Sequence, residues 1–154
     1  MTRIALLAAA ALMISVPAIA QAGPAPTGTV ANASADTAAL TLTFDVGAQT
    51  GLIMVALFDS AEAYDGRGAP VGQTVVDVAS GQRTAAFAGL KSGTYAAKIF
   101  HDVDGDGQMA TNPFGMPTEP YAFTNNARGN MGPAGWDRAN VVVTGATAQT
   151  ISLR

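Results

Sequence analysis

The stretch LTLTFDVGAQTGLIMVALF, residues 40–58, decides the fold class of this chain. From Leu40 to Val46, apolar residues alternate with threonine and aspartate, which predicts a strand with one buried face. The segment that follows, with glycine at both ends, predicts a turn. Leu52–Phe58 is then almost continuously apolar, as expected of a strand that is covered on both faces. The stretch therefore predicts two successive strands joined by a turn.

Turn signals divide the rest of the chain into further short strands. Residues 74–78 and 83–87 are predicted to pair as a hairpin, and residues 140–143 and 149–153 as a closing hairpin. Between the two hairpins, residues 94–101 alternate again and predict another strand. About seven short strands without a long helix are typical of an all-β, two-sheet antiparallel sandwich.

The N-terminus has the three parts of a secretory signal peptide. Arg3 supplies a basic start, residues 4–16 are apolar and uncharged, and small residues near Ala20 allow cleavage. Pro17 interrupts the run before it reaches the length of about 20 residues that a spanning helix needs. The chain also has no cysteine to carry a lipid anchor. We therefore expect export to the periplasm or the cell exterior, with no transmembrane segment left after cleavage.

Composition and charge narrow the class of protein further. The expected segments are a signal peptide at 1–22, a flexible leader rich in small residues at 23–36, and one β-sandwich domain of unknown function at 37–154. The chain has 8 Lys and Arg against 11 Asp and Glu, and loss of Arg3 with the signal peptide leaves 7 against 11, a net charge near −4. A mildly acidic chain without a basic cluster is a poor candidate for nucleic acid binding.

The long segment between residues 102 and 137 has no strand periodicity, and loops of this length in compact domains are usually functional or disordered. It contains four of the ten aromatic residues of the chain, Phe114, Tyr121, Phe123 and Trp136. Large rings bury about 150–250 Å² each when they pack. We therefore expect a long ordered loop that folds back as a cap over one end of the sandwich.

A ligand-binding surface is one hypothesis for this cap. Aromatic faces, carboxamides and a guanidinium are groups with which proteins bind sugars and peptides. The candidate ligand-binding residues are Tyr121, Phe123, Asn125, Asn126, Arg128 and Trp136. The alternative is structural, because rings can fix a loop while polar side chains satisfy its buried backbone. Under the binding hypothesis the candidate partners are a glycan, a peptide or an envelope protein.

The run DVDGDG at residues 102–107 is the strongest local motif. Carboxylates at alternate positions before a glycine turn can wrap oxygen ligands around Ca²⁺. An EF-hand is excluded, because Pro113 stands where a bidentate glutamate is needed and no helices flank the loop. The candidate metal ligands are Asp102, Asp104, Asp106 and Glu119, with Ca²⁺ as the candidate cofactor. The alternative is that Asp and Gly are the residues that exposed turns use.

No catalytic constellation is recognisable in the sequence. His101 is the only histidine, Asp102 points to the opposite face of a strand and is badly placed to orient its ring, and no G-x-S-x-G motif occurs. One histidine cannot build a zinc site of the usual type either. We therefore expect a non-catalytic protein, either a binding module or an envelope-associated one. The alternatives are a small hydrolase that uses Asp102, Asp104 or Glu119, and a purely structural accessory protein.

Five segments occur in an order that resembles a known family. They are residues 51–58, 89–95, 101–107, 114–119 and 123–127. Together, over nearly all of the mature chain, they are similar to an exported bacterial family of domains of unknown function, number 2141 (DUF 2141). The G-L-x-x-G-T-Y element of the second segment also resembles transthyretin-like sandwiches, which implies a prealbumin- or immunoglobulin-like Greek-key fold. The family implies no known activity.

Overall fold

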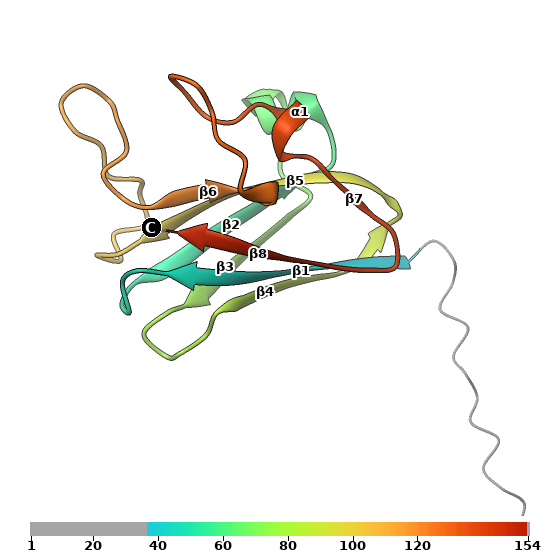
Figure 1. Ribbon diagram of the computed structural model, residues 1–154, viewed down its shortest axis with the longest axis horizontal. Helices are drawn as coiled ribbons and strands as arrows, with labels where there is room; N and C mark the ends of the chain where they lie inside the picture. Colours follow the sequence, from blue (N-terminus) through green and yellow to red (C-terminus); the bar gives the residue numbers. More distant parts are fainter. Residues whose placement is uncertain (1–36, 154) are drawn as a thin grey trace, which may run out of the picture. The chain divides into compact units, whose positions relative to one another are not determined.

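The computed structural model describes residues 37–153, so the predicted signal peptide (1–22) and leader (23–36) lie outside the described residues. The described residues form two β-sheets that pack face to face (Figure 1). Sheet A contains, in order across the sheet, β4 (Thr84–Lys91), β1 (Thr37–Val46) and β8 (Ala146–Leu153). Sheet B contains β3 (Gly72–Asp77), β2 (Leu52–Phe58), β5 (Gly93–Asp102) and β6 (Tyr121–Phe123), and β7 (Val141–Val143) also pairs with β5. The predicted all-β sandwich is confirmed, with β6 as a short additional strand inside the long loop.

The core lies between the inner faces of the two sheets. Leu40, Leu42 and Phe44 of β1 face it with the predicted alternation. Ile53 and Leu57 of β2 are fully buried against them from sheet B. Because apolar burial contributes about 25 cal/mol per Å², this layer is the main source of stability. The period-two pattern that predicted the strands is therefore the pattern of core burial.

The other face of β2 departs from expectation. The apolar run predicted cover on both faces, and Phe58 is indeed buried on the outer face of sheet B. Met54 and Ala56 point the same way but are only half-buried. The outer face of sheet B is therefore covered at the Phe58 end and partly open at the Met54 end.

The covered end of the outer face has a small core of its own. Two short helical elements pack on it, η1 (Ala63–Arg67) after β2 and α1 (Trp136–Ala139) before β7, while η2 (Thr124–Asn126) follows β6 directly (Figure 1). Its buried members are Phe58, Ala63, Tyr64, Ala96, Phe123, Ala134 and Ala139. No helix within residues 37–153 has both the length and the apolar character needed to span a membrane.

Both predicted hairpins are wrong in their pairing, although their strands exist. β3 pairs with β2 whereas β4 pairs with β1, so the connection between β3 and β4 crosses from one sheet to the other. In the same way β7 pairs with β5 whereas β8 pairs with β1, and β8 runs parallel to β1 in a sandwich that was expected to be antiparallel. Two short strands joined by a turn can pair within one sheet, or one can lie in each of the two facing sheets; in both arrangements their apolar residues enter the same core. Alternation alone does not distinguish these arrangements.

Candidate functional site

The open end of the outer face of sheet B has a simple side-chain layout. The strand registers place four residues side by side across β3, β2, β5 and β6, namely Val75, Met54, Phe100 and Tyr121. We call these four residues the apolar row. Since neighbouring strands lie about 4.8 Å apart, the row is about 14 Å long. In the next row along the strands, Lys98 lies between Ala56 and Phe123.

Two loops rise beside the apolar row, on the side of sheet B that faces away from sheet A (Figure 1). The 103–120 loop contributes Met109, Phe114 and Met116, and the 127–135 loop contributes Met131 and Pro133. With the row they border an open groove of about 1240 Å³, which we call the methionine groove. All four methionines of the described residues line it. Segments far apart in the sequence thus converge on one apolar surface.

The methionine groove concentrates the exposed apolar surface of the molecule. Seven large apolar side chains are exposed within residues 37–153, and five of them line the groove. These five are Val75, Phe114, Met116, Tyr121 and Met131. Phe114 is 89% exposed and Met131 is fully exposed, so neither contributes to a core. Contiguous exposed apolar surface of this kind marks binding sites in soluble proteins, and flexible methionines allow such a surface to adapt to its ligand.

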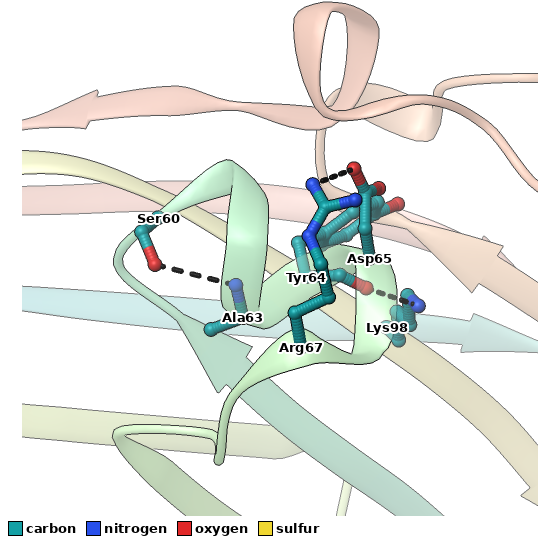
Figure 2. A network of polar contacts seen from close by, with 6 residues as sticks. All are labelled: Ser60, Ala63, Tyr64, Asp65, Arg67 and Lys98. Atoms are coloured by element: carbon teal, nitrogen blue, oxygen red, sulfur yellow. Dashed lines mark hydrogen bonds and ion pairs between the residues drawn. The ribbon is translucent and has the colours of Figure 1, made fainter.

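Among residues 37–153, Lys98 is the only charged residue that lines the groove. Its Nζ donates a hydrogen bond to the backbone carbonyl of Tyr64 at 2.5 Å (Figure 2). The same nitrogen lies 4.5 Å from the ring centroid of Tyr64 and 5.6 Å from that of Phe58, in cation–π geometry. Within residues 37–153 the only ion pair joins Arg67 to Asp65, so Lys98 has no carboxylate partner there. The ammonium is therefore held in position while its charge stays unpaired.

Tyr64 connects the covered end of the sheet to the wall of the groove. Its hydroxyl donates to the carbonyl of Ala134 at 2.9 Å, and its ring contacts Phe58 and Trp136 edge-on at 5.7 and 5.8 Å. Burial raises the pKa of the Tyr64 phenol, and the neighbouring charge of Asp65 raises it further. Tyr64 thus stays neutral and fastens the 127–135 loop to η1.

The 127–135 loop also depends on one glycine. A Cβ at Gly129 would overlap the backbone carbonyl of Gly132 and the carbonyl group of Pro133. The loop therefore folds back on itself only where position 129 has no side chain. This close approach holds Met131 at the tip of the loop, beside the groove.

The acidic run organises the base of the other loop. Asp102 is fully buried, and its carboxylate accepts hydrogen bonds from the amides of Gly105 at 2.7 Å, Gly107 at 2.8 Å and Asp106 at 3.2 Å. Burial alone would raise the pKa of this carboxyl, but the hydrogen bonds from Gly107, Gly105 and Asp106 lower it more, so that it lies below its ordinary value. Asp102 is therefore an ionised anchor for a tight turn.

Glu119 fixes the same loop from its other end. Its two carboxylate oxygens accept from the amides of Val103 at 2.8 Å and Ala110 at 3.0 Å. Oxygens of Asp102, Asp104 and Asp106 lie within 4.8 Å of one another and could together hold a cation, but among the described residues Glu119 is not part of that group. The structure therefore brings together three of the four candidate metal ligands. Asp102 and Glu119 both use their oxygens on the backbone.

The two asparagines of the candidate ligand site serve the fold. Asn125 and Asn126 adopt left-handed backbone conformations with φ of 61° and 50°. The Asn126 carboxamide donates to the carbonyl of Thr150 and accepts from the amide of Ser152, both at 2.8 Å. The Asn125 carboxamide donates to the carbonyl of Asn140 at 2.5 Å and accepts from the carboxamide of Gln149 on β8 at 2.6 Å. These side chains join the end of sheet B to β8 of sheet A, which is the structural role weighed as the alternative.

Four of the six candidate ligand-binding residues, Tyr121, Phe123, Asn126 and Arg128, border a second, more polar hollow of about 730 Å³. Tyr121 and Phe123 also line the methionine groove. Trp136 is half-buried against Tyr64 and is not among the residues that line either hollow. The structure therefore brings four of the six candidate residues together, beside the methionine groove rather than within it.

The sequence interpretation missed most of the groove, above all Lys98 and the methionines. One signal was available. Met109, Phe114, Met116 and Met131 are large apolar residues in a glycine-rich segment that has no strand periodicity, so no strand could bury them.

His101 lies near the C-terminal end of β5 and is fully buried. Its Nε2 lies 2.7 Å from the carbonyl of Thr50, to which it donates, and its Nδ1 has no hydrogen-bond partner among the described residues. This is the strand-end contact with a neighbouring loop that a structural histidine makes. It lies on the core side of sheet B, away from the methionine groove.

These features define a class of protein, an all-β sandwich with an apolar groove on the outer face of one sheet. The chain belongs to the family described as "Uncharacterized protein conserved in bacteria (DUF2141)", whose model matches residues 44–152. The predicted family is thereby confirmed. No curated protein and no solved structure matches the chain.

Proposed function

We propose that this protein is an exported, non-catalytic binding module whose ligand lies in the methionine groove. One observation carries the proposal: five of the seven exposed large apolar side chains within residues 37–153 gather on that groove. Exposed apolar surface is unfavourable in water by about 25 cal/mol per Å². A surface that concentrates it beside a stable core is typical of a ligand site.

Export is supported by the N-terminal sequence. A basic start, an apolar run and small residues before position 22 are the features that a signal peptidase requires. The mature chain would then act in the periplasm or outside the cell. Sequencing of the N-terminus of the cell-envelope and culture fractions should give a start near residue 21 or 23, and a full-length chain confined to the cytoplasm would contradict export.

The alternative, a small hydrolase that uses Asp102, Asp104 or Glu119, has less support than the binding module. Hydrolysis by paired carboxylates needs one carboxylic acid and one carboxylate that face a substrate. Asp102 is buried beneath its own turn, and Glu119 spans two backbone amides. The hydrogen bonds of both carboxylates thus favour a structural use of these side chains over a catalytic one.

The binding site can be tested with Nile red, a neutral dye that fluoresces in apolar surroundings. We expect saturable binding to the wild-type protein and a loss of affinity of about tenfold in a Phe114→Ser, Met131→Ser double variant, because both large apolar contacts disappear. Val142→Ser is the matched control, since Val142 is 64% exposed but lies outside the groove. Equal effects of the double variant and the control, or no dye binding at all, would refute the proposal.

A further inference from the structure

We infer that the ligand of the methionine groove is a single-chain anionic amphiphile, a free fatty acid, with its carboxylate at Lys98 and its chain over the apolar row. The inference rests on the proposed function and adds the chemical class of the ligand. It follows from the charge of the groove, the position of that charge and the shape of the apolar surface beside it.

The charge of the groove is a single unpaired cation. Of the described residues that line it, Lys98 is the only charged one and none carries a carboxylate. This contrasts with the whole chain, which is acidic, with a formal net charge of −3. A groove that lacks carboxylates in an acidic protein selects an anion and disfavours a cation.

The position of the ammonium suits a head group. An ammonium has three N–H donors, and the structure accounts for one of them, in the hydrogen bond to the Tyr64 carbonyl. The rings of Tyr64 and Phe58 hold the nitrogen from the side of the covered core without neutralising it. Donors therefore remain for a carboxylate that approaches from the groove.

The apolar surface begins beside that head-group position. Lys98 and Phe100 are successive residues on the outer face of β5, about 7 Å apart along the strand. Beyond Lys98 in the other direction, Ala96 is fully buried in the small core under Tyr64. The groove is thus closed at the Lys98 end. A chain that starts there can extend only over the apolar row, beneath the methionines of the two loops.

The same observations argue against a membrane surface as the partner. Binding to an anionic bilayer relies on clusters of basic residues, whereas this groove has one cation and the chain is acidic overall. One charge beside one open apolar groove of about 1240 Å³ fits one head group with one chain. A monomeric fatty acid in solution is the occupant that satisfies both features.

Calorimetry with two amphiphiles of equal chain length tests the inference directly. Dodecanoate and dodecyltrimethylammonium, each below its micelle concentration, are titrated into the delipidated exported form of the protein. We expect dodecanoate to bind about tenfold more tightly, because only its head group complements Lys98. Equal affinities, or tighter binding of the cationic amphiphile, would overturn the inference.

Variants of the two lysines locate the head group. Lys98→Met should weaken dodecanoate binding about tenfold, and Lys98→Arg should preserve the dodecanoate affinity. Lys91→Met is the charge-matched control, since Lys91 is exposed on β4 of sheet A. Dodecanoate binding that is unaffected by Lys98→Met, or weakened equally by Lys91→Met, contradicts the assignment. If Lys98→Met does not fold, the wild-type preference and Lys98→Arg still decide the question.

The outcome also separates this inference from the proposed function. Nile red binding with no preference for dodecanoate leaves the binding module standing and removes the fatty acid. Absence of binding of both the dye and the amphiphiles removes both.

Discussion

The two ends of the outer face of sheet B share the strands β2 and β5, but one end is covered by packed side chains and the other is open. At the Phe58 end, Tyr64 and alanines interlock over the sheet and exclude water. At the Met54 end, the apolar row is left open beneath two loops that carry methionines. Rings with few rotamers and small alanines pack into one fixed arrangement, whereas methionine adapts to many. The difference shows how one sheet face can supply stability at one end and a binding surface at the other.

Lys98 lies at the boundary between the two ends. Its ammonium lies over rings that belong to the covered end, while its side chain lines the groove. The covered end therefore positions the one charge that the open end uses. A change in the first should affect the second, whereas the reverse is not expected.

Removal of Tyr64 should have the largest effect on this arrangement. Tyr64→Ala removes a buried ring and leaves the Ala134 carbonyl unpaired, so we expect the free energy of unfolding to fall by about 3–5 kcal/mol. Urea denaturation measures this change. Tyr121→Ala at the open end is the matched control, because that ring is 46% exposed, and should cost about 1 kcal/mol. Equal costs at the two positions would show that the two ends do not differ as described.

The second prediction concerns the loop that borders the open end. Asp102→Ala leaves the amides of Gly105 and Gly107 without their acceptor and removes one of the two acceptors of the Asp106 amide. It should lower the free energy of unfolding by about 2–4 kcal/mol. Nile red affinity should fall as well, because the 103–120 loop carries Met109 and Met116. Asp106→Ala, which removes an exposed acceptor, is the control and should have a small effect on both readouts. A stable Asp102→Ala variant with normal dye binding would refute the role of Asp102 as anchor.

The third prediction separates the two ends by pH. The pKa of Asp102 is lowered on folding, so its contribution is present above about pH 4, the ordinary value for aspartate, and is lost as the pH falls below it. The pKa of Tyr64 is raised on folding, so its contribution is present below about pH 10 and is lost as the pH rises above it. Unfolding free energies between pH 2 and 12 should show both losses. Asp102→Asn should flatten only the acid side and Tyr64→Phe only the alkaline side; any other pattern contradicts the assignment.

The smallest effect on stability is expected from oxidation of the groove. Mild peroxide should convert the fully exposed Met131 and the exposed Met116 to polar sulfoxides before the half-buried Met54. We expect Nile red affinity to fall while the free energy of unfolding changes by less than about 0.5 kcal/mol. Peptide mass spectrometry gives the order of oxidation. A loss of stability equal to the loss of binding would show that these methionines belong to the core after all.

The sequence predicts the two-sheet sandwich but not which strands pair with one another. The alternation of Leu40, Leu42 and Phe44 follows directly from burial on one face, and it is read without any knowledge of the partner sheet. The sheet to which β4 or β8 returns after its turn depends on contacts between distant residues, and these leave no local periodicity. The predicted hairpins failed for that reason.

The candidate site was predictable only where aromatic rings marked it. Tyr121 and Phe123 were identified from their position in the long loop and do line the groove. Met54 was hidden within a continuous apolar run, and Lys98 appeared as an ordinary polar position of a strand. Both residues line the groove because only one half of the outer face of sheet B is covered by other segments. That cover depends on tertiary contacts and not on the local sequence. The Asn125–Asn126 pair suggested recognition, but its carboxamides are needed where two sheets meet.

The hydrogen bonds of Asn126 also bear on solubility. β8 is the last strand of sheet A, and an open strand edge invites pairing with the same edge of another molecule. The Asn126 carboxamide takes up the carbonyl of Thr150 and the amide of Ser152 on that edge, in the way that a neighbouring strand would. A single side chain thereby occupies two edge groups of β8 that a second copy of the chain would need for pairing.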